Sequence, residues 1–148
     1  MPGRFAPFMV GQDTFHTYAF CDARPGFATD VRPGDVIVGG ENFGCGSSRE
    51  YAPAALARLG IGGVVAKSFA RIFFRNCVNL GIPALESADA AALVRDGDEV
   101  ALDVTGGVLR TPRGDAALRL LPRFAREILA AGGVVAYLRE HGDFPALD

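Results

Sequence analysis

Short apolar runs alternate with segments of helical spacing in the middle of the chain. The apolar runs are DVIVGG at 35–40, GGVVA at 62–66 and IPAL at 82–85. Between them, PAALARLG at 53–60 and SFARIFFRNCVNLG at 68–81 repeat apolar residues every three or four positions, as one face of a helix does. A succession of strand, helix, strand, helix and strand predicts a mostly parallel sheet with right-handed crossovers. We therefore expect an α/β fold.

Residue types at the ends of these segments predict where the helices begin and end. Gly60 and Gly81 suit the left-handed conformation that closes many helices. Ser68 is the candidate N-cap of the second helix. From that start, an apolar stripe is expected to face the core, made of Phe69, Ile72, Phe73, Asn76 and Leu80.

The flanking segments have different patterns. GDEVALDVTGGVLRTPRG at 97–114 alternates apolar and polar residues across a Gly-Gly pair, which predicts a β-hairpin. PRFAREILAAGGVVAYLREHG at 122–142 predicts two helices with a Gly-Gly break between them. The first 34 residues show no clear period and are expected to form loop with short turns. Residues 1–148 are thus expected to form one domain, with flanking helices and a small additional β layer.

Composition narrows the class of protein. Hydrophobic residues make up 49% of the 148 residues and charged residues 22%, which is typical of a folded chain. A net charge of -2 with scattered basic residues argues against nucleic-acid binding. No apolar stretch reaches the roughly 20 residues needed to span a membrane, and the N-terminus does not resemble a secretory signal, so a cytoplasmic location is expected. The three cysteines, without metal-ligand spacing, argue against disulfides and bound metal.

The stretch GGENFGCGSSREYAP at 39–53 follows the first apolar run and carries most of the candidate chemistry. One interpretation is structural, because Ser47 to Glu50 fits the S-x-x-E capping box. Pro53 would then lie inside the helix, so the regular helix is expected to begin after Glu50. A phosphate loop is disfavoured, since neither G-x-x-x-x-G-K-[ST] nor G-x-G-x-x-G is present.

Two chemical interpretations also apply to this stretch. Cys45 lies in a glycine-rich turn and is a candidate nucleophile, although the sequence places no base beside it. Alternatively, free backbone amides, two hydroxyls and the Arg49 guanidinium could hold a di- or tricarboxylic acid and favour a serine alkoxide. Lys67 and Ser68 follow the second apolar run, so they are expected at the same sheet edge as Ser47, where open α/β sheets bind ligands.

Residues 42–83 resemble a known family. FGCGSSRE and the later SFARIF-RN---N-G-P segment occur in the order and spacing found in the small subunit of 3-isopropylmalate dehydratase, also called isopropylmalate isomerase. PGRF at 2–5 and RPGDVIVGG at 32–40 resemble upstream parts of the same family. The resemblance spans most of residues 2–85. It is specific for the free-standing swivel domain of the aconitase superfamily, and less specific for the substrate.

The resemblance implies a fold, a partner and a reaction. The family has a swivelling β/β/α domain that closes over a large subunit, and that large subunit carries a 4Fe-4S cluster, so this chain is expected to bind no cofactor itself. The reaction is the dehydration and rehydration of a small hydroxy-dicarboxylic acid, as in leucine biosynthesis. Ser47 would remove the carbon-bound proton, and Ser48, Arg49 and Arg4 would bind substrate carboxylates. Cleft-lining positions are expected at Cys45, Gly46, Lys67 and Ser68.

Several alternatives stay open beside 2-isopropylmalate as the substrate. The chain could instead serve a homoaconitate, citramalate-type or dimethylmalate hydratase, or be a non-catalytic subunit that kept the swivel fold. A small stand-alone dicarboxylate-binding domain is a third class, and self-association of the isolated chain is also open. The apolar set Phe5, Phe8, Met9 and Val10 suits either an alkyl substituent of the substrate or the core.

The sequence departs from the family pattern at two places. Tyr51 stands where the family motif carries a histidine, and a tyrosine can hydrogen-bond but cannot supply a cationic ring. The family also begins with a strand and an N-T-D-x-I-x-P segment, whereas this sequence begins after most of it. Either that strand lies upstream of the given start or this member lacks it.

Overall fold

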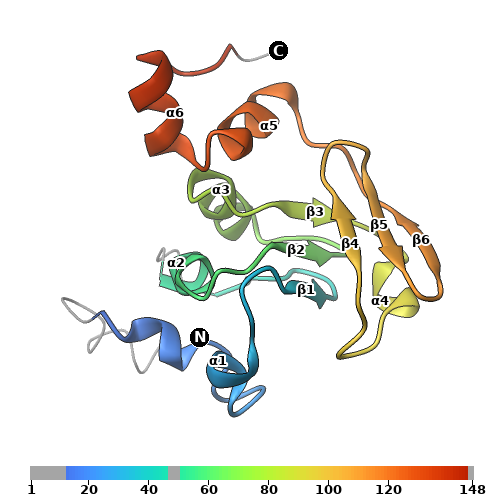
Figure 1. The fold of residues 1–148 in the computed structure, drawn as a ribbon. Helices are drawn as coiled ribbons and strands as arrows, with labels where there is room; N and C mark the ends of the chain where they lie inside the picture. Colours follow the sequence, from blue (N-terminus) through green and yellow to red (C-terminus); the bar gives the residue numbers. More distant parts are fainter. Residues whose placement is uncertain (1–12, 47–50, 147–148) are drawn as a thin grey trace.

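The structure is a computed structural model and describes residues 13–46 and 51–146 (Figure 1). The elements are, in chain order, η2 (Phe15–Tyr18), α1 (Phe27–Asp30), β1 (Val36–Gly39), α2 (Tyr51–Arg58), β2 (Gly63–Ala66), α3 (Arg71–Asn79), β3 (Ala84–Glu86), α4 (Ala90–Leu93), β4 (Ala101–Asp103), β5 (Val108–Thr111), β6 (Gly114–Ala117), α5 (Arg123–Ala130) and α6 (Val134–His141).

A parallel sheet forms the centre of the fold, in the order β1-β2-β3. Val38 pairs with Val65, and Val65 pairs with Leu85. The middle strand β2 is buried at every position, as expected for a parallel strand with both faces covered. The three expected apolar runs are therefore confirmed as strands, and their parallel arrangement is confirmed with them.

The two faces of the parallel sheet belong to two apolar clusters. Val64 and Ala84 point into a cluster that α2 and α3 close with Leu56 and Phe73. Val65 and Leu85, the next residues along the same strands, point into the opposite cluster. Because side chains alternate along a strand, two neighbouring apolar residues pack against the layers on opposite faces of the parallel sheet.

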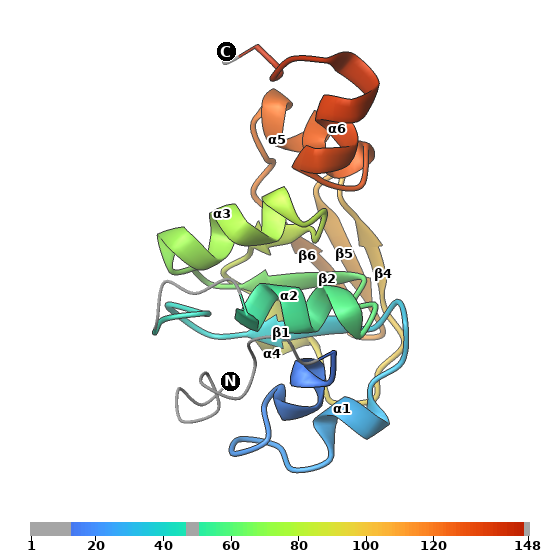
Figure 2. The same ribbon diagram turned by 90° about the vertical axis from the view of Figure 1, so that its left-hand side faces the viewer.

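A second, antiparallel sheet covers the other face, in the order β4-β5-β6. Figure 2 looks onto α2 and α3 and shows this sheet behind the parallel one. Leu109 of β5 and Ala116 of β6 are fully or almost fully buried against the parallel sheet. The expected hairpin is confirmed as β4 and β5. The strand β6 was not expected, because its sequence GDAA has little intrinsic β propensity.

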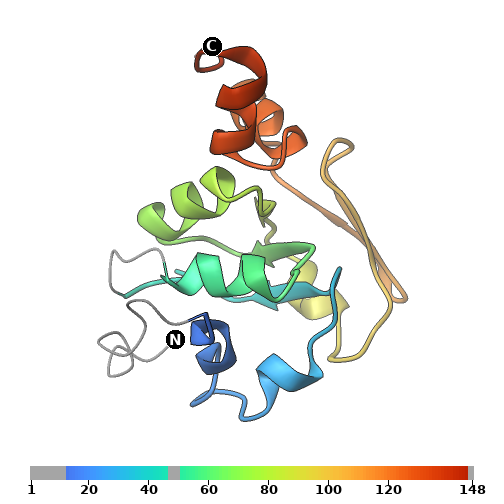
Figure 3. The same ribbon diagram turned by 60° about the vertical axis from the view of Figure 1, so that its left-hand side comes forward.

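The C-terminal helices α5 and α6 lie together at one end of the molecule, next to α3 (Figure 3). Gly132 and Gly133 separate them with φ of +85° and +118°, values that residues with a Cβ rarely adopt. The expected helix, Gly-Gly break and helix are confirmed. Within the described residues, every helix is too short or too polar to cross a lipid bilayer.

The start of α3 differs from the expectation. Ser68 is not the N-cap, because α3 begins at Arg71 and Ser68 Oγ accepts a hydrogen bond from the N–H of Asn42. The stripe expected from a start at Ser68 is partly wrong for the same reason. Ile72 and Leu80 are 49% and 38% exposed, whereas the buried residues of α3 are Phe73, Cys77 and Val78.

The expected end of the preceding helix agrees with the structure. The described part of α2 runs from Tyr51 to Arg58 and includes Pro53, and the expected start after Glu50 borders residues 47–50, which lie outside the described residues. Gly60 follows the helix with φ of +75°, as Gly81 follows α3 with φ of +78°. Both glycines therefore end their helices as the sequence indicates.

Candidate active site

The carboxyl ends of the parallel strands converge on one edge of the sheet. Lys67 directly follows β2, and its N–H donates to the carbonyl of Gly40, which directly follows β1 (N···O 3.1 Å). Ser87 directly follows β3, and its N–H donates to the carbonyl of Ala66 (2.9 Å). The segments that leave the three strands thus stay side by side, at the edge where open α/β sheets bind ligands.

The glycine-rich loop after β1 is fastened to the segment after β2. The N–H of Phe43 donates to the carbonyl of Ser68, and the N–H of Ala70 donates to the carbonyl of Phe43, both at 2.9 Å. The hydroxyl of Ser68 accepts from the N–H of Asn42 at 2.8 Å. Ser68 therefore stabilises the loop through its own main-chain and side-chain oxygens, and its expected cleft-lining role stays a prediction.

Aromatic packing holds the same loop against the core. The Phe43 ring lies 5.5 Å from that of Phe73 and 6.1 Å from that of Phe69, in edge-to-face arrangements that aromatic pairs favour. Glycine makes this approach possible, since a Cβ on Gly39 would overlap the Phe43 ring and one on Gly44 would overlap the Phe73 ring. The loop is thus a packed frame up to the residues that precede Ser47.

Two of the expected cleft-lining residues come at the end of this frame. Cys45 is exposed, and its N–H donates to the carbonyl of Asn42 at 3.0 Å. Gly46 is exposed with a φ of +145°, and no heavy atom of residues 13–46 or 51–146 lies within 4 Å of the position of a Cβ. The residues expected to act on substrate, namely Arg4, Ser47, Ser48 and Arg49, lie outside the described residues, as do Phe5, Phe8, Met9 and Val10.

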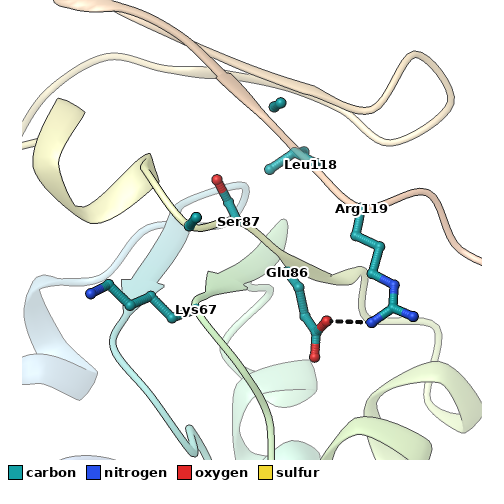
Figure 4. A pocket seen from close by; sticks show the side chains of 7 residues that line it. Lys67, Glu86, Ser87, Leu118 and Arg119 are labelled. Carbon is teal, nitrogen blue, oxygen red and sulfur yellow. Dashed lines mark hydrogen bonds and ion pairs between the residues drawn. The ribbon is translucent and has the colours of Figure 1, made fainter.

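A pocket of about 550 Å³ lies at the same edge of the sheet (Figure 4). Its lining residues are Lys67, Glu86, Ser87, Ala88, Ala117, Leu118 and Arg119. The Glu86 carboxylate pairs with the Arg119 guanidinium at 3.0 Å, and the N–H of Arg119 donates to the Glu86 carbonyl at 2.8 Å. Lys67 extends away from this ion pair. Lys67 is among the residues that line this pocket, and its expected role in the active-site cleft stays a prediction.

Sequence reasoning missed Glu86, Ser87 and Arg119. Ser87 could have been found by the rule that identified Lys67, because it too is the first residue after a parallel strand. Arg119 carried no such signal, since it follows β6 in the other sheet and reaches the pocket only through the packing of the two sheets.

An iron–sulfur cluster requires thiolate ligands, so the state of the cysteines decides whether this chain could hold one. Burial raises the pKa of Cys77 to about 12, so this thiol stays protonated. Across residues 13–46 and 51–146, no three His, Cys, Asp or Glu side chains gather closely enough to hold a metal ion. The donor groups in these ranges therefore do not fit such a cluster.

Comparison with known proteins gives the context of this site. The profile of the family described as Aconitase C-terminal domain matches residues 9–90, which include the loop after β1 and the segment after β2. The chain belongs to this family. Tyr51, where the sequence departs from the family motif, packs its ring edge-to-face on Phe15 with ring centroids 6.2 Å apart.

Members of the aconitase C-terminal domain family resemble the chain over nearly its whole length. It is 55% identical to the homoaconitase small subunit of Thermus thermophilus, covering 98% of this chain and 89% of the relative. It is 54% identical to a 3-isopropylmalate dehydratase small subunit of Deinococcus radiodurans, covering 98% and 81%. It is also 41% identical to the isopropylmalate/citramalate isomerase small subunit of Methanocaldococcus jannaschii, covering 95% and 84%.

A solved structure of the same family agrees with the fold. The crystal structure of 3-isopropylmalate dehydratase from Methanocaldococcus jannaschii superposes with a TM-score of 0.83 at 38% sequence identity. The match covers 92% of this chain and 83% of that one. At this identity and coverage the two chains share the α/β architecture, and the expected aconitase-type fold is confirmed.

Proposed function

We propose that this chain is the small subunit of a heteromeric hydro-lyase, which isomerises a small hydroxy diacid by dehydration and rehydration. 2-Isopropylmalate is the proposed substrate and 3-isopropylmalate the product. The observation that carries the proposal is the frame around the glycine-rich loop. Hydrogen bonds and aromatic packing fix this loop at the carboxyl edge of the sheet. The fixed part of the loop ends directly before Ser47.

The proposed roles follow from the chemistry of the residues after this frame. Ser47 is proposed to remove the carbon-bound proton, and Ser48, Arg49 and Arg4 to bind the substrate carboxylates. A serine hydroxyl is a very weak acid, so it can act as a base only where preorganised donors stabilise its alkoxide in a site closed to water. Guanidinium groups bind carboxylates through two parallel hydrogen bonds, which would orient the substrate.

The partner is proposed to be a large subunit that carries the 4Fe-4S cluster. The relatives' names support a heteromer because they describe small subunits. The donor groups of the described residues do not fit a cluster, in line with its assignment to the other subunit. A cytoplasmic location belongs to the same proposal, since free thiols such as that of Cys45 are typical of reducing compartments.

The proposed substrate rests on the segment that follows Arg4. Phe5, Phe8, Met9 and Val10 suit an alkyl group better than a third carboxylate. Homoaconitate is the second candidate, favoured by the 55% identity to a homoaconitase small subunit. Turnover of the reconstituted pair on 2-isopropylmalate, citramalate and homocitrate decides between them, and a preference for the tricarboxylate would reverse the order of the two candidates.

The test of the catalytic role is Ser47→Ala in the enzyme reconstituted anaerobically with its large subunit. Loss of a proton-transferring group is expected to lower kcat by roughly 10²- to 10⁴-fold. Assembly of the two subunits, measured by analytical ultracentrifugation, should not change. Ser48→Ala is the comparison, because loss of a carboxylate contact should raise KM more than it lowers kcat. Near-normal kcat in Ser47→Ala would remove this serine from the mechanism.

The same preparation tests whether the chain is catalytic at all. The small subunit is expected to show no turnover alone and to gain activity as the large subunit is added. Full activity of the large subunit without this chain would instead support a non-catalytic binding subunit. Binding of the diacid by the small subunit alone, with no effect of the large subunit, would support a stand-alone binding domain.

A further inference from the structure

Lys67 is the only lysine in the chain. The sequence contains 15 lysine and arginine residues, and every other one is an arginine. Lysine differs from arginine in carrying a compact charge on a flexible stem, with three donors that can turn toward a ligand. The single exception to arginine stands at the carboxyl end of the central strand β2.

The Lys67 ammonium has no partner among the described residues. The nearby carboxylate of Glu86 is already paired with Arg119. Figure 4 shows Lys67 extending away from that pair, and no ion pair or hydrogen bond joins its side chain to residues 13–46 or 51–146. The charges that line the pocket therefore sum to one uncompensated positive charge, which favours an anion.

The backbone of Lys67 is held beside the proposed active site. Its N–H donates to the carbonyl of Gly40, at the start of the loop that leads to Ser47. The origin of the Lys67 side chain is thus fixed to the edge of the sheet, while its four-carbon stem can adopt different rotamers. A lysine side chain anchored in this way can reach a ligand that sits over the carboxyl ends of β1 and β2.

The pocket beside Lys67 supplies room and a second donor. Ala88 and Ala117 have small side chains, and the volume of about 550 Å³ is in the range of small-molecule sites. Ser87 is 95% buried, and its Oγ accepts from the N–H of Ala90 at 3.3 Å. The hydroxyl proton of Ser87 finds no acceptor in the described part of the chain, so it is free to donate to a ligand.

We propose that Lys67 is a further substrate-binding residue, whose ammonium binds one carboxylate of the hydroxy diacid with the Ser87 hydroxyl as a second donor. This inference rests on the proposed function and adds a cation to the set named there. Lys67 would fix one end of the substrate over the carboxyl ends of the parallel strands, and the other carboxylate would be left to the residues named in the proposed function.

The kinetic test compares Lys67→Met with Lys67→Arg in the reconstituted enzyme. Loss of a charge-assisted hydrogen bond is expected to raise KM for 2-isopropylmalate by roughly ten- to a hundredfold, with kcat changed less than about threefold. Lys67→Arg keeps the charge and should recover most of the loss. Arg126→Met is the matched control, since Arg126 is an exposed cation on α5 whose side chain has no partner in the described residues.

A second test uses the fact that the chain has one lysine. Reductive methylation of the small subunit with ¹³C-formaldehyde before reconstitution labels only Lys67 and the terminal amine, and Lys67→Met identifies which signal is which. Addition of 2-isopropylmalate is expected to shift the Lys67 signal with a saturable dependence on concentration. Glutaramide, which is similar in size but uncharged, should cause no such shift.

The outcomes separate this inference from the proposed function. Unchanged KM in Lys67→Met, in an enzyme that loses activity in Ser47→Ala, overturns the role of Lys67 and leaves the proposed function in place. Weaker subunit assembly with unchanged KM also overturns it, and assigns the ammonium to a carboxylate of the large subunit. Normal activity in Ser47→Ala counts against the proposed function whatever Lys67 does.

Discussion

The three cysteines differ in environment although none of them is paired. Cys77 is fully buried on α3, Cys45 is exposed on the glycine-rich loop, and Cys21 is half-buried. Burial excludes water from the Cys77 sulfur and raises its pKa to about 12, because a thiolate would be poorly solvated there. At the residue scale, the surroundings of each thiol therefore decide its chemistry.

Thiol reactivity at pH 8 tests this difference. Ellman's reagent should modify Cys45 first and Cys77 only after unfolding, because the thiolate is the reactive form. Cys45→Ser is the control and should remove the fast phase. Stability linked to the protonated Cys77 thiol is complete below the ordinary pKa of 9.0 and is lost as the pH rises toward 12, since the unfolded chain ionises first. Rapid modification of native Cys77 would contradict its burial.

At the scale of single elements, the loop after β1 is shaped by its contacts more than by its own sequence. Asn42 adopts φ of +51° and Gly44 φ of +80°, so the backbone turns twice within three residues. The bridge between Phe43 and Phe69 extends the parallel pairing past the end of the strands. The loop therefore continues the sheet edge, and this continuation positions the segment that follows.

Gly44→Ala is expected to destabilise the protein and to displace the loop. The left-handed conformation penalises a Cβ, and this Cβ would overlap the Phe73 ring. Together these effects should lower the free energy of unfolding by about 2–4 kcal/mol in urea titrations. Gly40→Ala is the matched control, because no atom of the described residues lies within 4 Å of its Cβ position and its φ is not positive. Equal stability of the two variants would show that the loop is not packed as described.

At the scale of the whole molecule, the two apolar clusters share the parallel strands. Leu56 belongs to the cluster under α2 and α3, and Leu109 belongs to the cluster under the antiparallel sheet. Val64 and Val65 are adjacent in β2, and each belongs to a different one of the two clusters. Loss of either layer would expose one face of the central sheet, so the layers should depend on each other.

Leu56→Ala and Leu109→Ala test this dependence. Each substitution leaves a cavity around a buried leucine and should cost about 2–5 kcal/mol of unfolding free energy. Both variants should unfold in one transition, with far-UV circular dichroism and tyrosine fluorescence coinciding. Two separate transitions in either variant would show that the layers unfold independently.

Much of the fold could be predicted because its signals are local. Short apolar runs predicted the parallel strands, and the Gly-Gly pair predicted the break between α5 and α6. The start of α3 could not be predicted in this way, because Ser68 is a good N-cap by type but is taken by the Asn42 amide. β6 was missed since its stability comes from pairing with β5, not from its own residues.

The candidate site, like the fold, could be predicted from the sequence only in part. The residue types needed for carboxylate chemistry, and their place after a strand, can be recognised in the sequence, because strand ends and glycine-rich turns are local patterns. Among the described residues Arg119 has a charge partner and Lys67 has none. This difference depends on Glu86, whose pair with Arg119 forms only when the two sheets pack. The sequence alone determined which groups this chain can offer a substrate. The tertiary structure decided which of them remain free, because the pairing of charges across layers depends on distances that no local pattern encodes.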